Sequence, residues 1–169
     1  MMNLIVCHKS IRLSNKKELL DFLLDDKNGF YKPYVAEFDG GLSTYQNHGQ
    51  LHLQLPKKII NNLVKKIHSL VDERYTITDM WSNLHHNNSF TARHHHSTPQ
   101  YPHLISGVYY LKKPKNSGNI VFENYGVLGV KENDIVLFNQ SENTGWHWTE
   151  KNLSKQQRVI ISFNLAITK

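Results

Sequence analysis

The stretch HLISGVYYL, residues 103–111, predicts a β-strand, because its branched and aromatic residues favour extended backbone. Six similar runs follow Arg74, at residues 75–84, 90–95, 119–123, 134–138, 145–149 and 158–167. Turn-forming segments such as residues 114–118 separate them. Seven short strands at this spacing predict an all-β sandwich or barrel.

Helices are expected in the first half of the chain. Ser14 can cap a helix over residues 15–24, in which leucines share one face. Pro56 suits the first turn of a second helix, whose apolar residues recur at helical spacing. Residues 25–54 are rich in glycine, asparagine and aromatic residues and predict a long, partly irregular loop. A short apolar run over residues 4–7 predicts one further strand.

These patterns predict a single domain over residues 1–169, mainly β with N-terminal helices. Residues 1–74 would form a helical and loop support, and residues 75–169 would form the β core. A chain of 169 residues with 39% hydrophobic and 20% charged residues can bury a core without disulfides.

The composition also bears on compartment and partners. Cys7 is the one cysteine, so no disulfide can form within the chain and a reducing, cytoplasmic compartment is the simpler expectation. No apolar stretch approaches the roughly 20 residues of a membrane span, so we expect no membrane partner. The formal net charge of +6 leaves a nucleic-acid partner open, although solvated helix faces explain the lysine clusters more simply.

Histidine is unusually frequent, with 11 in the chain. On a strand, His94 and His96 would point to the same face and His95 to the opposite one. His147 stands between two tryptophans on a later predicted strand. Two close ligands and one remote histidine are the layout of the non-heme iron facial triad. We expect these three histidines to bind a metal ion; a surface run that binds metal adventitiously is the alternative.

Arg158 stands at the start of the last predicted strand, and the residues after it are apolar. An arginine buried there needs an anionic partner. A carboxylate that binds both arms of the guanidinium suits it best. A structural ion pair with Asp134 or Glu132 is the alternative.

Several blocks occur in a characteristic order: WSN at 81–83, HHH at 94–96, SGVYYL at 106–111, GNIVF at 118–122, NDIVLF at 133–138, His147, and Arg158 with SFN at 162–164. In this order and spacing they resemble the 2-oxoglutarate- and iron(II)-dependent oxygenases. The resemblance is to a small bacterial and phage group, similar to the prolyl hydroxylases, and it covers roughly residues 75–167.

The resemblance implies a double-stranded β-helix, a jelly-roll barrel like that of the cupins, in a bacterial or phage-infected cell. It implies an enzyme that uses Fe(II), 2-oxoglutarate and O2 to hydroxylate a protein side chain, an amino acid or another small molecule, releasing succinate and CO2. The residues that would bind the metal are His94, His96 and His147. The residues that would bind 2-oxoglutarate are Arg158, Tyr110, Ser106 and Asn83.

The sequence departs from this family at the second ligand, which is usually Asp or Glu and here is His96. His96 could be a true ligand, or the metal could have two protein ligands with water or chloride in the third place. A carboxylate such as Glu123 could also reach the metal. Three neutral imidazoles would leave a higher net charge at the metal, which should alter its redox poise and anion binding.

Two other functions stay open. One is a cupin-type metal dioxygenase that uses three histidines and no 2-oxoglutarate. The other is a non-catalytic module that binds nucleic acid or another partner and keeps a decayed metal site.

The loop segments could supply the substrate cleft. Tyrosines in these segments that could line it are Tyr31, Tyr34, Tyr45 and Tyr101. His85 and His86 are expected to face solvent or to support the site indirectly.

Overall fold

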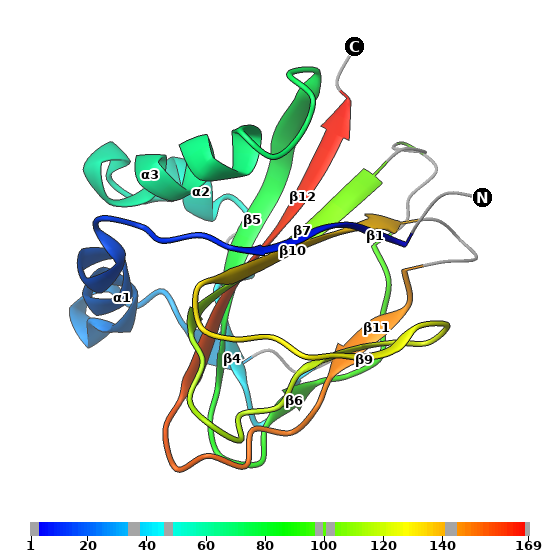
Figure 1. Ribbon diagram of the computed structural model, residues 1–169. Helices are drawn as coiled ribbons and strands as arrows, with labels where there is room; N and C mark the ends of the chain where they lie inside the picture. The colour runs from blue at the N-terminus through cyan, green and yellow to red at the C-terminus, as the bar shows by residue number, and fades with distance from the viewer. Residues whose placement is uncertain are drawn as a thin grey trace.

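The computed structural model describes residues 4–33, 38–45, 49–96, 100, 104–140 and 145–167. The protein is mostly β-structure in antiparallel sheets, with few helices (Figure 1). One large sheet forms a layer across the molecule. In the view of Figure 1, the helices lie on one side of this layer and the smaller sheets on the other.

The large sheet has seven strands, in the order β1-β10-β7-β12-β5-β4-β2. Its long central strands are β5 (Tyr75–His85), β7 (Leu104–Lys112), β10 (Asp134–Gln140) and β12 (Arg158–Ile167). The strands toward its edges are β1 (Ile5–Ser10), β4 (Leu42–Ser43) and β2 (Lys32–Pro33). β12, the last strand in sequence, lies between β7 and β5 and pairs with both.

Two smaller sheets make up the facing layer. The three-stranded sheet has the order β11-β8-β9, with bounds β11 (His147–Thr149), β8 (Ile120–Phe122) and β9 (Gly126–Leu128). The other pairs β3 (Phe38–Asp39) with β6 (Phe90–Thr91). An isolated bridge between His94 and His147 joins the segment after β6 to β11.

The helices pack on the outer face of the large sheet (Figure 1). They are α1 (Lys16–Leu24), α2 (Leu51–Gln54) and α3 (Lys57–His68), and a 3-10 turn, η1 (Asp26–Asn28), follows α1. Successive side chains along each strand point to opposite faces of the large sheet, so the sheet separates two hydrophobic cores. On β12, Ile161 and Phe163 pack in the core that includes the helices, whereas Ile160 packs with Tyr110 and Phe138 in the core between the layers.

The structure differs from the sequence expectation mainly in residues 25–54. The expected loop contains η1, three two-residue strands and α2, and elements this short leave no periodic pattern in the sequence. The strand expected over residues 90–95 ends at Thr91. His94 joins a sheet only through its bridge to His147.

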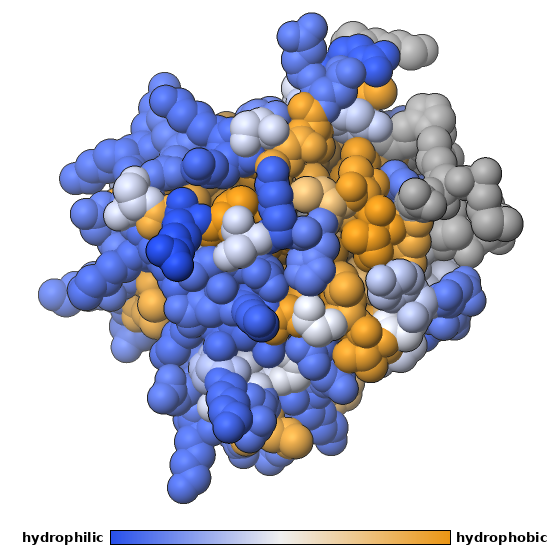
Figure 2. Space-filling view, in the orientation of Figure 1, coloured by the Kyte–Doolittle hydropathy of each residue, from blue (hydrophilic) through white to orange (hydrophobic). Residues whose placement is uncertain are grey.

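Exposed lysines cluster on α3, namely Lys57, Lys58, Lys65 and Lys66. In the view of Figure 2, hydrophilic residues cover the side that carries the helices, and apolar residues gather toward β1, where Val6 is exposed. The α3 lysines thus lie on a solvated helix face. No helix among the described residues is long and apolar enough to cross a bilayer.

Gly107 is required by the packing at the centre of β7, where its strand partners are Leu137 and Phe163. A β-carbon at this position would overlap the ring of Phe163 and crowd Leu137. We expect Gly107→Ala to lower the free energy of unfolding by about 1–3 kcal/mol in urea denaturation, as overpacked cores do. Gly129→Ala is the control, because a β-carbon there meets nothing within 4 Å. Equal losses in the two variants would contradict this account of the sheet.

Candidate metal centre and cavity

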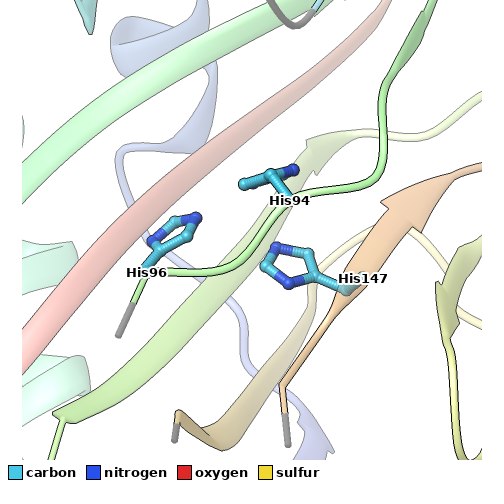
Figure 3. Close-up of side chains that lie close together, drawn as sticks. All are labelled: His94, His96 and His147. Carbon is cyan, nitrogen blue, oxygen red and sulfur yellow. The ribbon is translucent and has the colours of Figure 1, made fainter. Parts of the chain in front are cut away.

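Three histidine side chains converge between the layers of the fold (Figure 3). The ligand atoms that His94, His96 and His147 can offer all lie within 4.8 Å of one another. Backbone pairing brings two of these residues together, because His94 N donates to His147 O at 2.9 Å and His147 N donates to His94 O at 3.0 Å. The structure thus brings together the three histidines that the sequence singles out.

Each of the three imidazoles uses Nδ1 in a hydrogen bond within the protein. For His94 and His147 the acceptor is the carbonyl oxygen two residues earlier, at 2.8 and 2.7 Å. For His96 it is Asn164 Oδ1, at 2.9 Å. Because all three partners are acceptors, Nδ1 carries the proton and Nε2 carries the lone pair that a metal ion needs. A hydrogen bond from the ring nitrogen that does not bind the metal is typical of metal-binding histidines.

Burial keeps two of these rings neutral. The pKa of His96 is lowered to about 3, chiefly by burial and then by repulsion from His94. The same causes hold the pKa of His147 well below its ordinary value. Neutral imidazole is the form that binds a metal, so His96 and His147 would lose no proton on binding one at neutral pH.

A cavity of about 410 Å³ lies beside the histidines. Alternate residues of β5, β7 and β12 line it in rows across the large sheet: Asn83, Ile160 and Tyr110 form one row, and Asp79, Asn164 and Ser106 form another. Four residues of β12 separate these rows, which is about 13 Å at roughly 3.3 Å per residue. The cavity therefore has a Tyr110 end and an Asn164 end, and His96 belongs to the latter.

Arg158 is completely buried at the start of β12. Its Nη1 donates to the carbonyl oxygens of Ser117 and Glu150. Nη2 donates to Thr149 Oγ1 at 2.9 Å, and Nε donates to His85 Nδ1 at 3.4 Å. These bonds use four of the five N–H donors of a guanidinium. No carboxylate in the described part of the chain forms an ion pair with Arg158.

Tyr110 lines the cavity close to Arg158, which is not itself among the described lining residues. Its hydroxyl is buried and has no hydrogen-bond partner within the described residues. Burial raises the pKa of Tyr110, and the proximity of Arg158 opposes this only in part, so the hydroxyl stays protonated. Burial also lowers the pKa of Arg158 to about 10, which leaves the guanidinium charged at neutral pH. A carboxylate bound here would supply both the anion that the buried Arg158 lacks and the acceptor that the buried Tyr110 hydroxyl lacks.

The carboxylates considered from the sequence are bound elsewhere. Asp134 contacts His8, and Glu132 pairs with Lys16, so the structural ion pair with Arg158 does not form. Glu123 is partly exposed, and its carboxylate accepts two hydrogen bonds from the Arg93 guanidinium. It is not among the residues that converge with the three histidines.

Ser106 and Asn83, both singled out from the sequence, line the cavity in different rows. Ser106 Oγ donates to Asn164 Oδ1 at 2.8 Å, so Ser106 lies at the Asn164 end and supports His96 through Asn164. Asn83 Oδ1 accepts from Ser43 Oγ at 2.8 Å, and this residue lies in the row of Tyr110.

The sequence pattern predicted no functional role for Asn164 or Thr149 and only an indirect one for His85. His85 is completely buried and neutral, since burial and then Arg158 hold its pKa well below the ordinary value. The alternation of side chains along a strand could have pointed to Asn164, because residues 158 and 164 share a face of β12. Of the tyrosines expected near a substrate, Tyr45 lines the cavity, whereas Tyr31 pairs with Ser82. Those at positions 34 and 101 lie outside the described residues.

Comparison with known proteins gives no match to a family model and no match to a curated protein. Solved structures do match. The chain is similar to a viral collagen prolyl hydroxylase from Paramecium bursaria Chlorella virus-1 in complex with 2-oxoglutarate, at 16% identity and a TM-score of 0.67, covering 95% of this chain and 96% of that one. It is also similar to a Trichoplax adhaerens prolyl hydroxylase in complex with a hypoxia-inducible-factor peptide fragment, at 16% identity and a TM-score of 0.70, covering 95% and 83%.

A third similar structure is HygX from Streptomyces hygroscopicus with nickel, 2-oxoglutarate and hygromycin B bound, at 11% identity and a TM-score of 0.56, covering 95% and 83%. At these identities the likeness concerns the fold. The resemblance to 2-oxoglutarate- and iron(II)-dependent oxygenases, prolyl hydroxylases among them, is confirmed at that level. The antiparallel sheets are consistent with the jelly-roll fold of these enzymes.

The role of His96 can be tested by substitution. If His96 is a true ligand, we expect His96→Ala to weaken metal binding by at least about 100-fold, more than the loss of a supporting residue. Calorimetric titration with Co(II) would measure this. His95→Ala is the matched control, because the His95 ring packs on Trp146 at 4.1 Å between centroids. Unchanged affinity in His96→Ala would instead indicate two protein ligands.

Proposed function

We propose that this chain is an Fe(II)- and 2-oxoglutarate-dependent oxygenase built on a double-stranded β-helix. Its substrate would be a protein side chain, an amino acid or another small molecule, which it would hydroxylate. The observation that carries the proposal is the buried, unneutralised Arg158 beside the unsatisfied hydroxyl of Tyr110, in the same interior as three oriented histidines.

The presence of both kinds of group in one interior favours a ligand with two functional ends. One end must bind a metal, and the other must present a carboxylate to Arg158 and Tyr110. 2-Oxoglutarate has this form, because its keto acid can chelate iron while its distal carboxylate remains available. The solved structures with the same fold include complexes with 2-oxoglutarate, which supports this choice of ligand.

The donor set fits Fe(II). Imidazole nitrogen is a suitable ligand for iron, and three ligands on one face leave positions open for a co-substrate and O2. The Nε2 atoms of His94, His96 and His147 would hold the ion. With no carboxylate ligand, the site would keep the full charge of the metal, which favours an anionic co-substrate. Bound iron, 2-oxoglutarate and O2 would together supply the oxidising power, with succinate and CO2 as co-products.

The protein's own residues would position the reactants. Arg158 and Tyr110 would donate to the distal carboxylate, and Asn83 lies in the row where it could contact the same molecule. Asn164 would hold the His96 ring, and Ser106 would hold Asn164. Such pre-positioning can account for a large part of a rate enhancement.

The two other functions fit the site less well. A cupin-type dioxygenase without 2-oxoglutarate has no use for a charged guanidinium and an unsatisfied hydroxyl in its interior. A module with a decayed metal site would not need three imidazoles whose Nδ1 atoms all have acceptors.

The Tyr110 hydroxyl provides a selective test. We expect Tyr110→Phe to weaken 2-oxoglutarate binding to the Ni(II)-loaded protein by about 10-fold or more, since hydrogen bonds to charged groups contribute about 1.5–3 kcal/mol. Calorimetric titration would give the dissociation constants. Ni(II) is chosen so that no turnover occurs during the titration.

Tyr109→Phe is the matched control. Tyr109 is the preceding residue on β7, packs in the core on the helix side and contacts Asn133. We expect its loss to leave the affinity for 2-oxoglutarate unchanged. Equal effects of the two substitutions, or no binding of 2-oxoglutarate to the wild-type protein, would refute the proposed function.

A further inference from the structure

One carboxylate in the cavity is not used as a metal ligand or as a partner of the co-substrate in the proposed function. Asp79 lines the cavity on β5, in the row of Asn164. Its Oδ2 accepts from Thr78 Oγ1 at 2.8 Å and from Asn164 Nδ2 at 3.4 Å, and both donors are neutral. Within the described ranges, no lysine or arginine pairs with Asp79.

The charge of Asp79 is also not neutralised by histidine in the described part of the chain. The charge of Asp79 raises the pKa of His52, but burial lowers this pKa by more. His52 is therefore neutral at neutral pH. Among the cavity-lining residues described, Asp79 is the one carboxylate.

Aromatic rings flank this carboxylate. Trp81 lies two residues further along β5, on the same face, and its ring is 5.4 Å from that of His96. The rings of Tyr45 and Trp81 contact each other in a T-shaped arrangement at 5.2 Å between centroids, and Tyr45 is 40% exposed, so it lies where the cavity meets solvent. Ring faces attract cations within about 6 Å, and a carboxylate beside them adds a direct ionic partner.

Groups of opposite charge thus lie toward the two ends of the cavity, because Asp79 lines it and Arg158 is buried close to Tyr110. The strand partners of Asn164 and Arg158 on β5 are Asp79 and His85, six residues apart, which is about 20 Å at roughly 3.3 Å per residue. The distal carboxylate of the co-substrate belongs at the Arg158 end. Asp79 lies in the row of Asn164, and its carboxylate can form a direct ion pair with an organic cation there.

We propose that the substrate presents an organic cation, an alkylammonium or guanidinium group such as a lysine or arginine side chain carries, to Asp79 beside the contacting rings of Trp81 and Tyr45. This inference rests on the proposed function, because it names the substrate class of the same site. The cation would bind Asp79, and the aliphatic chain attached to it would lie along the aromatic rings toward the histidines.

The test compares cationic probes with a neutral one of similar shape. The probes are the Nα-acetyl amides of lysine, arginine and norleucine, free and within a capped Gly-X-Gly tripeptide, titrated into Ni(II)- and 2-oxoglutarate-loaded protein and followed by ligand-observed NMR. We expect a cationic probe to bind about tenfold more tightly than its norleucine counterpart. Preference in the free amides or in the tripeptides distinguishes a small-molecule substrate from a peptide.

Two substitutions sharpen the test. Asp79→Asn should remove the preference, whereas Asp26→Asn makes the same charge change in η1, away from the cavity, and should keep it. The comparison in the wild-type protein does not depend on how well either variant folds. Equal or absent binding of all probes, or a preference that survives Asp79→Asn, would overturn the inference.

Failure of the proposed function has a different signature. In that case 2-oxoglutarate does not bind the metal-loaded protein, and the probes can be compared without it. If 2-oxoglutarate binds and no cation is preferred, the proposed function stands and the inference about Asp79 is wrong.

Discussion

Two backbone hydrogen bonds between His94 and His147 hold the candidate site together. They join segments 53 positions apart, outside any regular ladder. Thr91 N extends the link by donating to Thr149 Oγ1 at 2.9 Å, and that oxygen also accepts from Arg158 Nη2. These hydrogen bonds between the segment from β6 to His94 and strand β11 therefore position two of the histidines and one arm of the Arg158 guanidinium. They thus connect the backbone of two of the converging histidines to the side chain of Arg158.

The electrostatics of the interior follow from which groups are buried. Burial keeps the imidazoles of His96 and His147 neutral, whereas Arg158 stays charged because its pKa is far above neutrality even when lowered to about 10. An unpaired buried cation costs several kcal/mol in general, which backbone carbonyls offset only in part. A bound carboxylate would offset more. In the proposed function, the co-substrate would therefore complete the charge balance of this interior.

The sequence singled out the three histidines and Arg158 as candidate site residues, because residue type and alternate spacing are visible in one chain. It also predicted the long strands of the second half. It did not predict the short elements within residues 25–54, because two-residue strands have no period. It placed Asn164 in a motif but gave it no role, because its contact with His96 depends on how separate segments meet. The uncompensated charge of Asp79 is likewise a property of the folded chain, since it depends on which groups reach it.

The central claim is that one site binds iron and 2-oxoglutarate together. Anaerobic titration of the apoprotein with Fe(II), followed by 2-oxoglutarate, tests this claim most directly by visible absorption. A weak metal-to-ligand charge-transfer band that appears only when both are present is the predicted result. A spectrum that does not change when 2-oxoglutarate is added to the Fe(II)-loaded protein would contradict the account.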